Sequence, residues 1–197
     1  MRDSRRAGVD TVFARVQEIA KGAAMIAGAE HTLTVQTGYT DEIILETGIR
    51  LAHDNLVRIG APTSTAEELQ FARELQMATG VPEVGMSAVP LPLRPIAADP
   101  PGGSTDVGDV SWVVPTIHFY VATAPKGVPW HAWPVVAASG MSIGHKGMVV
   151  AANALAATAV DLFENTATRE AVRTEFTNKT KGLVYRWYVP DGPPPVP

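Results

Sequence analysis

The sequence contains no cysteine. Disulfide bridges, thiolate nucleophiles and thiolate metal ligands are therefore excluded, and any metal ion would have to be held by imidazole, carboxylate and water. The chain also lacks an uncharged apolar run of about 18 residues, so no membrane span is expected. Charged residues follow the N-terminal arginines where a signal peptide would have its apolar region. We therefore expect a cytoplasmic chain.

A large excess of one charge is also absent. The 16 Lys and Arg residues are nearly balanced by 20 Asp and Glu residues, which gives a net charge of -4. Proteins that bind nucleic acids usually carry a basic patch, so neither a nucleic-acid nor a membrane partner is expected. With 46% hydrophobic residues in 197, the chain is long enough to bury one sizeable core.

Apolar periodicity predicts helices that alternate with strands. The expected helices span residues 9–28, 46–58, 64–80, 142–163 and 168–179, and the expected strands span residues 31–37, 112–123 and 185–188, with a further candidate at 134–138. Ser64 and Glu67 have the spacing of a capping box for the third helix. Six prolines between Val81 and Pro101 predict an irregular loop. This alternation predicts an α/β or α+β fold.

A glycine-rich loop follows that proline-rich segment. Gly103, Ser104 and Thr105 offer backbone N–H groups and hydroxyls that can converge on an anion such as a substrate carboxylate. The alternative interpretation is a simple turn in which Ser104 and Asp106 bond the neighbouring backbone.

His131 lies between two tryptophans in a loop that contains prolines, where a neutral imidazole could ligate zinc. A lone histidine is, however, more often a hydrogen-bonded core or interface residue. His118 is interpreted as structural because it falls inside an apolar segment, and His31 and His53 have no partner at ligand spacing.

Residues 140–144 match Gly-x-Ser-x-Gly, the pattern of a nucleophile turn. A serine esterase would use Ser142 as nucleophile, His131 or His145 as base and Asp106 or Asp109 as orienter, without any cofactor. No histidine follows His145, whereas the fold that carries this turn places its histidine last. Ser142 is also explained as the N-cap of the long helix.

Three ordered stretches, residues 103–112, 129–133 and 142–148, together with Glu175–Phe176, make the chain resemble the co-catalytic metal amidohydrolases, which include aminoacylases and glutamate carboxypeptidases. The resemblance covers nearly the whole chain. It implies the C-terminal half of a zinc-binding α/β catalytic domain together with a helix-strand remnant of an inserted dimerisation domain.

The resemblance also implies a domain plan and a function. Residues 1–38 would be the remnant of the inserted domain, residues 39–190 the catalytic part and residues 191–197 a Pro-rich tail. His131 would ligate zinc or another divalent metal, and Gly103, Ser104 and Thr105 would face the substrate carboxylate. The implied reaction is hydrolysis of amide bonds in small N-acyl or aminobenzoyl amino acids.

Members of this family are about twice as long, and their other metal ligands precede the inserted domain. We therefore expect a fragment with impaired or incomplete activity, whose exposed apolar surface drives formation of a homo-oligomer. The alternatives are the esterase at Ser142 and a non-catalytic interaction module.

Overall fold

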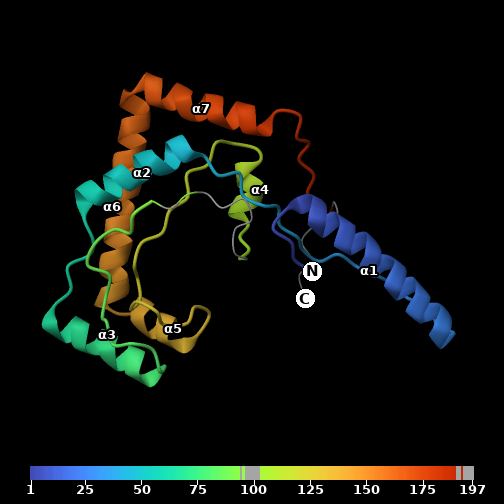
Figure 1. Ribbon diagram of the computed structural model, residues 1–197, viewed down its shortest axis with the longest axis horizontal. Coiled ribbons are helices and arrows are strands. Elements are labelled where there is room, and N and C mark those ends of the chain that lie inside the picture. The colour runs from blue at the N-terminus through green and yellow to red at the C-terminus, as the bar shows by residue number, and fades with distance from the viewer. Residues whose placement is uncertain (94, 96–102, 190–191, 193–197) are drawn as a thin grey trace. The chain divides into compact units, whose positions relative to one another are not determined.

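The computed structural model describes residues 1–93, 95, 103–189 and 192. Over these residues it contains seven helices and no strand (Figure 1). The helices are α1 (Arg6–Ala27), α2 (Glu46–Ile59), α3 (Ala66–Ala78), α4 (Val107–Ser111), α5 (Trp133–Ser139), α6 (Ser142–Glu164) and α7 (Thr166–Thr180). The predicted Pro-rich tail at 191–197 lies outside the described residues except for Gly192, as does the end of the proline-rich loop.

The chain divides into two compact units. Unit 1 comprises the described residues of Met1–Ile44, Pro95–Thr116 and Phe176–Pro197, and unit 2 those of Leu45–Arg94 and Ile117–Glu175. The domain plan of residues 1–38, 39–190 and 191–197 stays a prediction.

The predicted α/β class is wrong for the described part of the chain, which is all-helical. Residues 31–37, 115–123 and 183–187 have no regular structure, because a strand needs a partner for its backbone groups and the alternation of side chains supplies none. Residues 134–138 lie in α5 instead. Pro134 stands at the start of that helix, where its fixed φ favours helix and its missing N–H is not needed.

The five predicted helices are confirmed as α1, α2, α3, α6 and α7. The capping box of α3 lies one residue later than predicted. Thr65 accepts a hydrogen bond from the Glu68 N–H at 3.3 Å, and the Glu68 carboxylate accepts one from the Thr65 N–H at 2.7 Å. The pair Ser64 and Glu67 has the same spacing but does not form the box.

In unit 2, α2 and α5 pack against α6 (Figure 1). Asn55 of α2 is buried and donates to Thr158 at 3.2 Å and to Asp161 at 2.8 Å on α6. Glu175 of α7 accepts hydrogen bonds from the first N–H groups of α2, those of Glu46 and Thr47. These bonds satisfy helical backbone donors that have no partner inside the helix.

The apolar core of unit 2 connects α3, α5 and the segment between them. Its buried members are Leu75, Ala124, Val128 and Ala138. The amide of Gln76, fully buried beside them, donates to the carbonyls of Gly85 and Lys126 and accepts from the Gly85 N–H. This one side chain fixes the irregular segment after α3 to the segment that precedes α5.

Unit 1 is held together by polar contacts around Arg6. Its backbone N–H donates to Asp41 at 2.8 Å, and its guanidinium lies 4.1 Å from the centre of the Tyr188 ring and bonds the Arg186 carbonyl. Burial and a hydrogen bond to Asp10 raise the pKa of Tyr188 to about 12. The N-terminal end of α1 is thereby fixed, while the rest of that helix buries no residue.

Within the described residues, α6 is the one helix that is long and apolar enough to cross a membrane by length and composition. Core helices of soluble proteins meet the same criterion, so this is weak support for a span. The expectation of no membrane partner stays a prediction.

Candidate functional site

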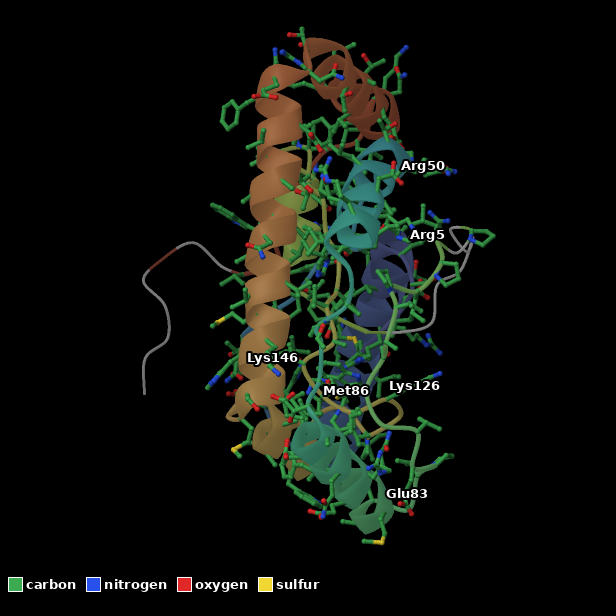
Figure 2. The ribbon with its side chains drawn as sticks, turned by 90° about the vertical axis from the view of Figure 1, so that its left-hand side faces the viewer. Arg5, Arg50, Glu83, Met86, Lys126 and Lys146 are labelled. Atoms are coloured by element: carbon green, nitrogen blue, oxygen red, sulfur yellow. The ribbon has the colours of Figure 1, made fainter. Side chains whose placement is uncertain are left out.

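The N-terminal ends of α3 and α6 meet at Glu68. Lys146 of α6 donates from Nζ to Glu68 Oε2 at 2.7 Å and to the Thr63 carbonyl at 3.0 Å; Figure 2 labels this lysine. Ser142, one turn earlier on α6, hydrogen-bonds the same carboxylate. The carboxylate that caps α3 therefore also holds the first residues of α6.

These donors lower the pKa of Glu68 to about 2, with the Lys146 hydrogen bond as the largest cause and the Ser142 bond next. An ammonium group near a helix N-terminus is disfavoured by the helix dipole, and the Glu68 carboxylate offsets that cost. Lys146 and Ser142 are both engaged in this contact, which we call the Glu68 clamp (Glu68, Ser142 and Lys146).

The second half of the 103–112 motif forms α4 and packs on residues 40–43. Ser111 is buried, accepts from the Ile43 N–H at 2.8 Å and donates to the Gly108 carbonyl at 2.6 Å. The Trp112 indole donates to the Asp41 carbonyl at 2.7 Å. A Cβ on Gly108 would lie 1.9 Å from the Thr40 carbonyl oxygen, so only glycine permits this approach.

The predicted substrate loop stands immediately before α4. Gly103 and Ser104 are exposed, and Thr105 is partly buried. Thr105 Oγ1 accepts a hydrogen bond from the Val107 N–H at 3.3 Å, so its own proton stays available for an outside acceptor. The loop is therefore accessible and precedes a well-anchored helix.

The predicted metal ligand His131 is exposed and has a backbone φ of 60°, in the left-handed region. A residue other than glycine rarely adopts this conformation, which is found more often at functional sites than elsewhere. Among the described residues no group of three or more His, Asp or Glu side chains could hold a metal ion. The described residues thus do not fit the implied metal.

The residues of the predicted esterase lie in different units. Ser142 and His145 are exposed at the start of α6 in unit 2, whereas Asp106 is exposed before α4 in unit 1. Met141, not Ser142, is the N-cap of α6, and the Ser142 hydroxyl serves the Glu68 clamp. The catalytic assignment of Ser142, His145 and Asp106 stays a prediction.

Sequence reasoning missed a cavity of about 750 Å³ in unit 2, lined by residues from α2, α6 and the irregular segments 60–62, 87–93 and 118–130. His53 and His118, interpreted above as unpartnered and structural, both line it. One signal was present in the sequence, because Ile49, His53 and Leu56 recur at spacings that place them on one face of α2.

Comparison with known proteins shows which class of enzymes the chain is related to. The chain is a distant homologue of enzymes of the amidohydrolase and dipeptidase type, as the sequence resemblance predicted. No protein-family model matches the sequence, and no solved structure matches it.

Two curated relatives carry this homology. A p-aminobenzoyl-glutamate hydrolase subunit from Escherichia coli (strain K12) is 29% identical over 96% of this chain and 44% of its own length. The Xaa-Arg dipeptidase of Mus musculus is 41% identical over 40% of this chain and 18% of its own length. The chain therefore spans less than half the length of either relative.

Proposed function

We propose that the chain takes part in the hydrolysis of amide bonds in small N-acyl or aminobenzoyl amino acids. The observation that carries this proposal is homology with the p-aminobenzoyl-glutamate hydrolase of Escherichia coli across 96% of the chain. The dipeptidase match supports the same bond type, since a peptide bond is an amide. As part of the proposal the chain is cytoplasmic, forms a homo-oligomer and has no nucleic-acid or membrane partner.

The family resemblance implies zinc or another divalent metal, but the described residues do not fit such an ion. The role that we assign to this chain's own residues is recognition of the substrate carboxylate. The hydroxyls of Ser104 and Thr105 and the backbone N–H groups of the loop can donate to a carboxylate. The packing of Gly108 and Ser111 against residues 40–43 holds the base of that loop in place.

Release of the aromatic amine from p-aminobenzoyl-glutamate, with and without added Zn²⁺, tests the proposal. Thr105→Val should raise KM about tenfold, because a hydrogen bond to a charged group contributes about 1.5–3 kcal/mol. Thr174→Val, a matched change at an exposed position of α7, should leave KM unchanged. If no amide in a panel of N-acyl amino acids is cleaved under either condition, the proposal fails.

The same assays separate the alternatives. Ester hydrolysis that survives exhaustive chelation and disappears in folded Ser142→Ala would establish the serine esterase instead. Absence of metal binding and of any amide or ester cleavage would leave the non-catalytic interaction module.

A further inference from the structure

The walls of the unit 2 cavity are mainly apolar. Ile49 and Leu56 of α2, Val150 of α6 and the loop residues Val89, Leu91 and Leu93 face it. Its volume of about 750 Å³ falls in the range of small-molecule sites, roughly 300–1,000 Å³. Such walls favour an organic ligand with an apolar body.

Among the described residues that line this cavity, Lys126 carries the one full charge. The described lining includes no aspartate or glutamate, whereas Lys126, His53 and His118 are present. In the described part of the chain the Lys126 ammonium has no carboxylate within ion-pair distance, and its side chain is exposed. Within the residues that the structure describes, the contacts of Lys126 with Gly85 and Gln76 are made by its backbone.

Aromatic rings complete the cavity lining. The rings of His118 and Tyr120 pack with their centres 4.7 Å apart and their planes tilted by 36°, and Tyr120 and Trp130 are largely exposed. Exposed aromatic rings beside an apolar cavity gain most from a ligand that covers them.

We propose that this cavity is a binding site for a small apolar carboxylate, with the ligand body against α2, α6 and the 87–93 loop and its carboxylate paired with Lys126. The described lining of this cavity does not include the loop residues Gly103–Thr105, and the inference goes beyond the proposed hydrolysis. Lys126 is held in position because Gln76 and Gly85 fix its backbone.

Binding of three matched probes to the full chain tests the proposal by calorimetry. The probes are 4-phenylbutyrate, neutral 4-phenylbutanol and cationic 4-phenylbutylamine, which share one apolar body. We expect phenylbutyrate to bind at least about fivefold more tightly than phenylbutanol, a difference of about 1 kcal/mol. Lys126→Gln should abolish this preference, and Lys21→Gln, the same change at an exposed site on α1, should not.

Two further variants make the outcome decisive. Lys126→Glu should reverse the preference toward phenylbutylamine, and it alters an exposed side chain whose backbone contacts persist. Val150→Trp should weaken binding of all three probes by filling the cavity. The proposal is overturned if phenylbutyrate does not bind, if phenylbutylamine binds equally well, or if Lys126→Gln leaves the preference intact. Because hydrolysis is not measured, this outcome is independent of the proposed function.

Discussion

Helices α3 and α1 differ in what holds them. The 13-residue helix α3 buries four residues, including the polar Glu68 and Gln76, and both of these bond segments distant in the sequence. The 22-residue helix α1 has a clear apolar periodicity and an anchored N-terminal end, yet none of its residues is buried. Periodicity thus suffices to form a helix, whereas specific polar partners fix where a helix packs.

The largest effect should come from Gln76→Ala. The change removes the acceptor of the buried Gly85 N–H and the side-chain donor to the part-buried Lys126 carbonyl, which should lower the free energy of unfolding by about 3 kcal/mol. Urea denaturation measures it. Gln70→Ala, at an exposed position of the same helix, should cost at most about 0.5 kcal/mol. If Gln76→Ala and Gln70→Ala lowered the free energy of unfolding equally, the buried Gln76 contacts would not be what holds α3.

A pair of glycine substitutions should act in opposite directions in the two units. A Cβ on Gly147 of α6 would lie 2.5 Å from the Ala122 carbonyl oxygen, so Gly147→Ala should destabilise by about 2 kcal/mol. In α1, a Cβ on Gly22 would meet no described atom outside the adjoining helix backbone within 4 Å, and Gly22→Ala should stabilise by about 0.5–1 kcal/mol. Thermal melting of both variants decides. A loss of stability in Gly22→Ala would mean that α1 is packed more closely than described.

The Glu68 clamp should make stability depend on pH. Because the pKa of Glu68 falls from 4.5 to about 2 on folding, its contribution is present above about pH 4.5 and is lost as the pH falls through 2. Glu68→Gln should flatten the stability profile over this window, whereas Glu164→Gln, at the exposed end of α6, should not. Denaturation at a series of pH values is the measurement. If the free energy of unfolding of Glu68→Gln depended on pH as steeply as that of the wild type, the Glu68 clamp would be contradicted.

Substitution of an exposed apolar residue of α1 should have the smallest effect on the free energy of unfolding, but it should clearly reduce self-association. Met25 and Ile26 are 75% and 91% exposed. Ile26→Glu should change stability by no more than about 0.5 kcal/mol and shift the chain toward monomer in sedimentation. Gln17→Glu adds the same charge without removing an apolar side chain and should leave association unchanged. A wild-type monomer at micromolar concentration would refute the predicted self-association.

The helices could be predicted because their signals are local, but their partners could not. Both Ser64 with Glu67 and Thr65 with Glu68 satisfy the capping-box spacing. The second pair forms the box, and its Glu68 also binds Lys146, a contact that depends on the tertiary fold. The predicted strand at 112–123 failed for a similar reason. Trp112 ends α4 and bonds Asp41, and no described segment pairs with residues 115–123.

The candidate sites show the same limit. The sequence drew attention to Gly103–Thr105 and His131, and the structure shows Gly103, Ser104 and His131 to be exposed and Thr105 to be partly buried. The sequence alone did not indicate that His53 and His118 line one cavity, because His53 lies on α2 and His118 in a segment far along the chain. Proximity of that kind is set by packing and not by sequence spacing.

The bonds from Glu175 to the start of α2 bear on the order of folding. They join residues separated by 128 and 129 positions, so the first turn of α2 acquires these acceptors only after α7 has been synthesised. Bringing residues so far apart in the sequence together costs chain entropy before any stabilising contact forms, and chains with many such contacts fold slowly. On the ribosome, the first turn of α2 would lack these acceptors until Glu175 has been synthesised, so unit 2 could not be completed before α7 emerges.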